Sequence, residues 1–228
     1  MKINLNTIKI YFLTVDTNGA RKHHMFEEFK GSDITEINPI LNIGKNKSGT
    51  TGFSKMIDLA LRQQKRYLPF QPFILFEDDC SKYREFPNEL VIPDNTDILY
   101  IGLSKCGTHK DTTWAQQVYM TEIDNDLVRV YNMLASHAIM VCSASGALAL
   151  QKAILESYFM GNPWDIFIAG IQPDYNVYAL KNPLVYQDAA FGGAEEMTKF
   201  QLLDPIQNSE LPPYHRIHCV SNLTCQGL

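Results

Sequence analysis

The chain has 228 residues, 45% of them hydrophobic and 20% charged, which is enough to bury a core of ordinary size. Its formal net charge of -5 and pI near 5.7 argue against a surface built mainly for nucleic acid, because phosphate binding needs clustered Lys and Arg. The one dense basic run, Arg62 to Arg66, falls on an expected helix and is expected to be a solvated face of it.

The cysteines and the apolar segments bound the cellular context. Neither a CxxC pair nor an even framework is present, so neither a zinc site nor a disulfide scaffold is indicated. No apolar stretch approaches the length needed to span a bilayer. We therefore expect a cytoplasmic protein without a transmembrane segment, either free or peripheral to a membrane. The five cysteines are Cys80, Cys106, Cys142, Cys219 and Cys225.

The first third of the chain predicts a β-α-β unit. An apolar run from Lys9 to Val15 predicts a buried strand, which ends in a turn cluster at residues 16–19. Residues Ala20 to Phe29 predict a helix, and Asp33 to Asn38 a second strand. A polar loop is then expected between Asn42 and Thr51. A further helix is expected from about Thr51, because apolar residues recur at helical spacing after it and Thr50 or Thr51 can cap it.

The remaining elements continue the alternation of strands and helices. Residues 72–76 form a short apolar run of the kind found in a central strand buried on both faces. Further strands are expected at 97–103, 117–123, 127–132, 137–142, 173–180 and 183–187, and a helix at 143–158. This alternation predicts an α/β fold, with ligands at the carboxyl ends of the strands. We expect one domain over 1–228, with a core at about 8–192 and a tail, 193–228, that wraps it.

Three consecutive acids, Glu77, Asp78 and Asp79, follow the expected central strand. Like charges this close repel and raise one another's pKa, and a cation removes that cost. Because side chains alternate along a strand, Glu77 and Asp79 are expected to point the same way and Asp78 to the other face. Two carboxylates on one side form an oxygen-rich half-shell that suits Mg²⁺ or Mn²⁺. The alternative is a solvated acidic turn.

Residues 73–79, Phe-Ile-Leu-Phe-Glu-Asp-Asp, resemble the "LEDD" strand of the family 25 glycosyltransferases, the lipooligosaccharide and collagen galactosyltransferase group. Other short segments resemble the family in the same order along the chain. Departures are Lys55, where the family has His, and Thr50, where it has Glu. The similar segments are Tyr11–Leu13 with Asn18 and Arg21, Gly49–Lys55, Asp97–Gly102, His137–Val141, Pro163–Asp165 and Pro183–Gln187.

This resemblance implies a GT-A type fold, with a Rossmann-like nucleotide-binding sheet, and a metal that bridges the phosphates of a nucleotide-sugar donor. Asp79 would be the direct ligand of Mn²⁺ or Mg²⁺, and Glu77 would ligate it through water or contact the ribose. Asp78 belongs to the donor-binding set but is expected to turn back into the fold. The helix start at Thr51 and Lys55, together with Arg21, would contact a UDP- or GDP-sugar.

The family inverts configuration, which implies a carboxylate base that takes the proton of the acceptor hydroxyl. Asp165 matches best, although an acid at a helix start also stabilises the helix dipole. Asp188 is the reserve candidate. GT-A enzymes often complete the metal shell with a late histidine; His215 and His218 are the candidates, at most one can serve, and His218 is the choice.

The sequence thus predicts a glycosyltransferase that moves a sugar to the hydroxyl of a glycan, glycolipid or glycoprotein acceptor. Two alternatives stay open. One is a metal-dependent nucleotidyltransferase or other phosphoryl-transfer enzyme, since carboxylates at a strand end also serve that chemistry. The other is a domain of similar fold that binds without catalysis.

Overall fold

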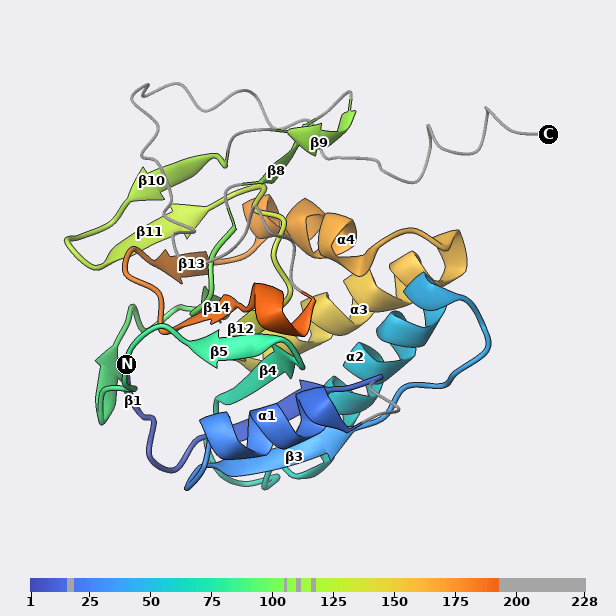
Figure 1. The fold of residues 1–228 in the computed structure, drawn as a ribbon. Coiled ribbons are helices and arrows are strands. Elements are labelled where there is room, and N and C mark those ends of the chain that lie inside the picture. The colour runs from blue at the N-terminus through green and yellow to red at the C-terminus, as the bar shows by residue number, and fades with distance from the viewer. Residues whose placement is uncertain (16–18, 105, 110–111, 116–117, 193–228) are drawn as a thin grey trace.

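The structure is a computed structural model, and it describes residues 1–15, 19–104, 106–109, 112–115 and 118–192 (Figure 1). Its centre is an eight-stranded mixed sheet with helices on both faces. This is the α/β fold that the alternation of elements predicts, and the sheet is Rossmann-like, as the family resemblance implies. From one edge to the other the strands are β10 (Met120–Glu122), β11 (Leu127–Val130), β13 (Val177–Leu180), β7 (Ile98–Tyr100), β12 (Ala138–Val141), β4 (Phe73–Glu77), β2 (Lys9–Leu13) and β3 (Asp33–Ile37).

Strand β4 lies in the interior of this sheet, as its apolar sequence predicts. It is parallel to β2, with Lys9 opposite Phe73 and Leu13 opposite Glu77. β2 is also parallel to β3, whereas β12 runs antiparallel to β4. The chain passes from β2 through a helix to β3 on one side, and then returns through a second helix to β4 on the other side of β2. The carboxyl ends of β2 and β4 form a topological switch point, the usual place for a ligand in such a sheet.

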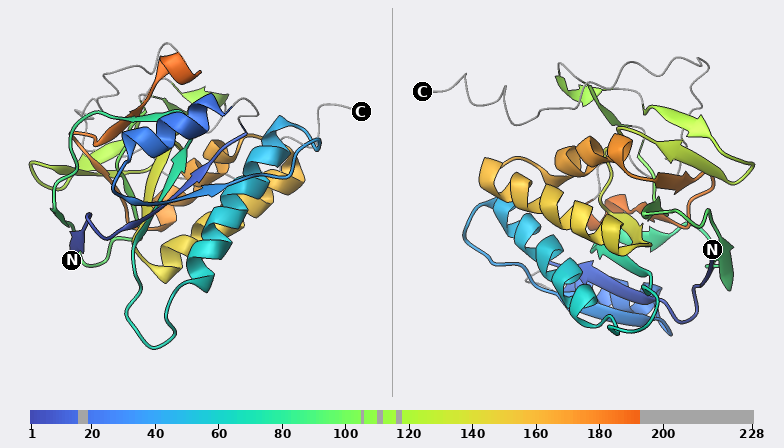
Figure 2. Two further views of the ribbon diagram at one scale, coloured as in Figure 1. Left: turned by 60° about the horizontal axis from the view of Figure 1, so that its bottom comes forward. Right: turned by 180° about the vertical axis from the view of Figure 1, so that it is seen from behind.

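The four helices of the described part divide between the two faces of the sheet (Figure 2). On one face, Met25 of α1 and Phe29, which directly follows α1, pack with Phe12 and Phe76. α2, α3 and α4 cover the other face, where their apolar residues pack on alternate residues of the same strands. In the residues that the structure describes, none of the helices is long and apolar enough to cross a bilayer. The helices are α1 (Ala20–Glu28), α2 (Lys45–Arg62), α3 (Ala144–Met160) and α4 (Trp164–Ile171).

Three short strand pairs lie outside the main sheet. The pair β5–β14 matters most for the site, because β5 begins directly after the acidic triplet and pairs Cys80 with Gln187. Of the other two pairs, one joins the amino-terminal strand to a later strand, and one joins two strands that are consecutive in the chain. The pairs are β1 (Lys2–Asn4) with β6 (Glu89–Val91), β5 (Cys80–Lys82) with β14 (Val185–Gln187), and β8 (Gly107–His109) with β9 (Thr112–Ala115).

Two expectations about elements are wrong. The expected loop at 42–51 is helical from Lys45, so Thr51 lies inside α2 and does not cap it. Gly44, with a φ of 93°, turns the chain, and packing of the helix on the sheet then outweighs its weak helix formers. The expected strand at 173–180 begins only at Val177, because residues 172–174 form a 3-10 turn. The expected tail at 193–228 lies outside the described residues.

Candidate functional site

The acidic triplet lies at the switch point, where β4 turns into β5. Glu77 is the last residue of β4, and Asp78 and Asp79 form the turn that precedes Cys80. Asp78 and Asp79 are only 5% and 6% exposed. A solvated acidic turn would leave its carboxylates in water, so burial of these two side chains argues against that alternative.

Glu77 accepts a hydrogen bond of 2.5 Å from the hydroxyl of Ser136. Burial, with the charges of Asp79 and Asp165 acting in the same direction, raises the pKa of Glu77 to about 8, and the hydrogen bond from Ser136 opposes this shift. That Glu77 and Asp79 point to the same side stays a prediction.

Asp78 forms an ion pair of 2.8 Å with Arg21, at the start of α1. The alternation of side chains predicts such a turn of Asp78 toward the fold. Its other oxygen, Oδ2, is buried and has no hydrogen-bond partner within the described chain. Arg21, expected to contact a nucleotide, lies against this acid, and its positive charge opposes the rise that burial causes in the pKa of the neighbouring Asp79.

Asp79 is fixed through its backbone and one oxygen. Its carbonyl accepts from the N–H of Asp188 at 2.8 Å, and its Oδ2 lies 3.4 Å from the amide nitrogen of Gln187. Oδ1 is buried, and no partner for it lies among the residues described. Burial, together with the charge of Asp78, raises the pKa of Asp79 to about 6 against the opposing charge of Arg21.

Asp165 is the second residue of α4, and its Oδ1 accepts a hydrogen bond of 2.9 Å from the N–H of Ile166. Burial raises its pKa. The preceding Trp164 is held between α2 and α4, because its ring packs on Phe53 and against Gly49. A Cβ at Gly49 would lie only 2.1 Å from that ring. Packing of the indole thus fixes the position of Asp165.

Asp188 has a different environment, in which its oxygens are already used. Its Oδ2 accepts from the hydroxyls of Ser81 at 3.0 Å and Tyr186 at 3.3 Å, and Oδ1 accepts from the N–H of Ala190 at 2.9 Å. Burial alone would raise its pKa, but these hydrogen bonds outweigh burial and lower it. Asp188 is thus a capping residue and a weak base, which favours Asp165 for proton transfer.

Thr51 and Lys55 are engaged elsewhere in α2. The Thr51 hydroxyl donates to the carbonyl of Ser48 and accepts from the N–H of Ile40, and the Lys55 ammonium donates to the carbonyl of Asn38. These contacts hold the segment before α2 and do not connect either side chain to the acidic triplet. His218 lies outside the described residues.

Two side chains at the site were not expected from the sequence as site residues. Gln187 belongs to a segment of the family resemblance, and the pairing of β14 with β5 places it beside Asp79. Ser136 has no signal of its own, since only the register of β12 against β4 brings it next to Glu77.

The buried oxygens suit a divalent cation. Within the described ranges, Asp78 Oδ2 and Asp79 Oδ1 accept no hydrogen bond, and a hard cation prefers charged oxygen ligands. Across the described ranges no group of three or more His, Cys, Asp or Glu side chains is placed to hold a metal by itself. The arrangement therefore fits an ion whose remaining ligands come from phosphate and water.

Comparisons with known proteins add a distant likeness in structure. No protein family model matches the chain, and no curated protein does. Among solved structures, the chain is similar to the CTP:phosphocholine cytidylyltransferase of Streptococcus pneumoniae, with 14% sequence identity and a TM-score of 0.39. The alignment covers 80% of this chain and 72% of that one. At this TM-score the likeness does not assign an activity.

Proposed function

We propose that the chain is a metal-dependent transferase that binds the diphosphate of a nucleotide-activated substrate and transfers a sugar from it to an acceptor hydroxyl. The observation that carries this proposal is the pair of buried carboxylate oxygens at the carboxyl end of β4 that receive no hydrogen bond from any described residue. They lie at the switch point of the sheet, where nucleotides bind in α/β folds.

Asp79 would hold Mn²⁺ or Mg²⁺ directly, with the buried Oδ2 of Asp78 as a further candidate ligand, and Glu77, which is bonded to Ser136, would ligate the ion through water. When bound, the cation stabilises the negative charge that grows on the leaving diphosphate. With a pKa of about 8, Glu77 mainly keeps its proton at neutral pH, whereas Asp79, with a pKa of about 6, is mainly ionised there but is protonated more readily than an exposed aspartate. A cation stabilises the ionised forms, so nucleotide, cation and these two acids are expected to bind together.

Asp165 would serve as the general base. Its carboxylate comes from α4, on a different element from the triplet, and a raised pKa makes it a stronger proton acceptor. In the proposed reaction the acceptor oxygen attacks the anomeric carbon, the bond from that carbon to the diphosphate breaks, and the hydroxyl proton passes to Asp165. UDP- or GDP-sugars are the proposed donors, and a glycan, glycolipid or glycoprotein hydroxyl the acceptor.

Nucleotidyl transfer from a nucleoside triphosphate is the second candidate. Its supporting observation is that Glu77 interacts with both Asp79 and Asp165, a set of carboxylates that can also serve phosphoryl chemistry with two metal ions. The products distinguish the two reactions, because glycosyl transfer releases a nucleoside diphosphate and nucleotidyl transfer releases pyrophosphate. A binding domain without catalysis would release neither.

The test is an assay of the purified protein with a panel of nucleotide sugars and, separately, nucleoside triphosphates, each with Mn²⁺, Mg²⁺ or EDTA. We expect release of nucleoside diphosphate from at least one nucleotide sugar, only with metal. Asp58→Asn, an exposed acid of α2, is the matched control for Asp79→Asn. Pyrophosphate release without sugar transfer would replace the proposal by the second candidate.

A further inference from the structure

The basic run noted in the sequence leaves the helix on which it was expected. α2 ends at Arg62, and residues 63–72 form the loop that leads to β4. Figure 2 (left) shows this loop projecting from the body of the molecule. Residues 65–69 are all exposed, with Tyr67 at 90% and Leu68 at 55%. A large aromatic and an aliphatic side chain thus stand at the tip of a protruding loop.

The charges around this tip have one sign. Residues 62–72 contain three cations and no acid, in a chain whose net charge is -5. Arg62 is paired with Asp58 of the helix. Arg66 lies over the ring of Tyr67 at 5.9 Å, and Lys65 forms no ion pair with any described residue. Two positive charges at the tip are thus available to an anionic surface.

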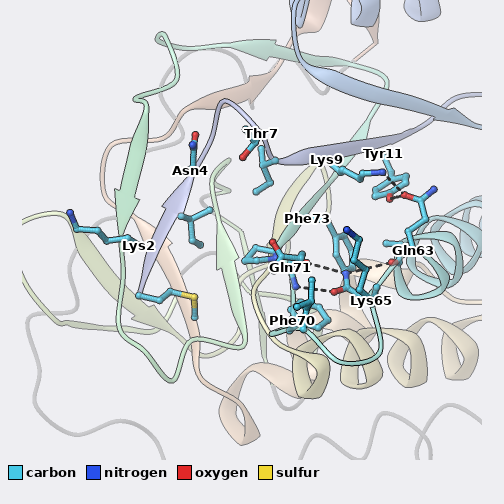
Figure 3. A pocket seen from close by; sticks show the side chains of 17 residues that line it. Lys2, Asn4, Thr7, Lys9, Tyr11, Gln63, Lys65, Phe70, Gln71 and Phe73 are labelled. Carbon is cyan, nitrogen blue, oxygen red and sulfur yellow. Dashed lines mark hydrogen bonds between the residues drawn. The ribbon is translucent and has the colours of Figure 1, made fainter.

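Behind the loop lies a pocket of about 640 Å³ (Figure 3). It borders the amino ends of β2 and β4, with Lys9 and Phe73 in its lining. It therefore lies at the opposite ends of these strands from Glu77. Its cationic side chains are Lys2, Lys9 and Lys65, and its apolar wall includes Phe70. A pocket of this size holds a small polar molecule or a lipid headgroup.

The lysines of the pocket are only weakly neutralised by neighbouring acids. Lys9 lies 3.9 Å from Asp33, and Lys2 lies 3.5 Å from Glu89. Exposed pairs at such distances contribute little. The amide oxygen of Gln63 accepts from both the Lys9 ammonium and the Tyr11 hydroxyl, at 2.8 Å each, which holds the Lys9 side chain at the pocket.

We propose that this loop and pocket dock the protein on the surface of an anionic phospholipid bilayer. Tyr67 and Leu68 enter the interfacial layer, where aromatic side chains are favoured. Lys65 and Arg66 contact lipid phosphates, and the pocket receives a headgroup. Apolar and cationic groups acting together are the two signals that stable peripheral binding needs. The carboxyl ends of β2 and β4, where the acidic triplet lies, then face away from the bilayer. This inference is independent of the proposed function.

The experiment is flotation of the full chain with vesicles of phosphatidylcholine alone or mixed with phosphatidylglycerol. We expect binding only to the mixed vesicles, weakening as salt is added. Lys65→Ala with Arg66→Ala should lower the partition coefficient about thirtyfold, because each basic residue at a charged membrane contributes about fivefold. Tyr67→Ser with Leu68→Ser should lower it on the order of tenfold.

Phe159→Ser is the matched control, because Phe159 is an aromatic residue of α3 that is 79% exposed and lies outside the loop. It should bind vesicles as the wild type does. The proposal is overturned if wild type does not bind mixed vesicles or if both loop variants bind them as the wild type does. It is overturned too if the partition coefficient of the Phe159 variant falls as much as that of the loop variants. It is also overturned if glycerol 3-phosphate in solution displaces the protein from the vesicles completely, because a soluble phosphate would then be the ligand. Circular dichroism of each variant confirms that it is folded.

Discussion

At the scale of single residues, the environment of each carboxylate separates acids that look alike in the sequence. Asp78 is paired with Arg21, Asp188 is used as a cap, and Asp165 is buried with a raised pKa. Alternation along β4 predicts that Asp78 turns away from Glu77, and the ion pair of Asp78 with Arg21 is consistent with this. The partners Ser136 and Gln187 could not be predicted, because they reach the site only through strand register.

The assignment of Asp165 as base predicts a loss of turnover without a loss of nucleotide affinity. Asp165→Asn should lower the transfer rate on the order of a hundredfold to ten-thousandfold, because the base acts on the acceptor proton. Asp188→Asn should cost far less turnover and mainly destabilise the turn at Ala190, since its carboxylate caps that turn. Single-turnover rates and calorimetric nucleotide binding of both variants test this. Equal losses of turnover in Asp165→Asn and Asp188→Asn would contradict the assignment of Asp165 as the base.

His137 predicts a pH dependence of folding stability. It is 1% exposed, its Nε2 has no partner in the part of the chain that the structure describes, and burial lowers its pKa to about 4. Between the ordinary value of 6.5 and about 4, the unfolded chain binds the proton and the folded chain does not. Stability therefore falls as pH drops through this window, by about 1.4 kcal/mol for each pH unit.

Urea denaturation of wild type and His137→Gln from pH 7 to pH 5 measures this contribution. The difference in unfolding free energy between the two proteins should shrink as the pH falls, because glutamine does not titrate. A difference that stays constant over the range would show that His137 is protonated equally in both states.

At the scale of elements, the central strand was predictable and the start of α2 was not. An apolar run followed by acids predicts where β4 lies, because a strand buried on both faces has little choice of sequence. The beginning of α2 depends on contacts with distant residues. Gly49 and Gly52 let the helix approach Trp164 and Leu13, and neither contact can be inferred from local sequence.

The close approach at Gly49 predicts a coupled loss of stability and activity. Gly49→Ala places a Cβ about 2.1 Å from the Trp164 ring, so α2 and α4 must separate. Overpacking of this kind costs about 1–3 kcal/mol, and the shift of Trp164 displaces Asp165. Gly170→Ala in α4 meets nothing within 4 Å and should instead stabilise the helix slightly. Thermal unfolding and turnover of the two variants provide the comparison; an active, undisturbed Gly49→Ala would contradict it.

At the scale of the whole molecule, one sheet carries two distinct ends. The carboxyl ends of β2 and β4 hold the acidic site, and their amino ends border the pocket with Lys9. The alternating apolar pattern predicts the sheet and both of its packed faces. The projecting loop at 63–72 was not predicted. The basic run was expected to lie on a helix, whereas α2 ends at Arg62.

The central claim is that the triplet binds nucleotide through a metal, and calorimetric titration tests it most directly. UDP and GDP are titrated into wild type and Asp79→Asn, with Mn²⁺ and with EDTA. We expect Mn²⁺ to enhance binding to wild type, and Asp79→Asn to lower that affinity by at least about tenfold while the protein stays folded, because an amide lacks the charge that a hard cation requires. Metal-enhanced binding that persists unchanged in Asp79→Asn would contradict the account.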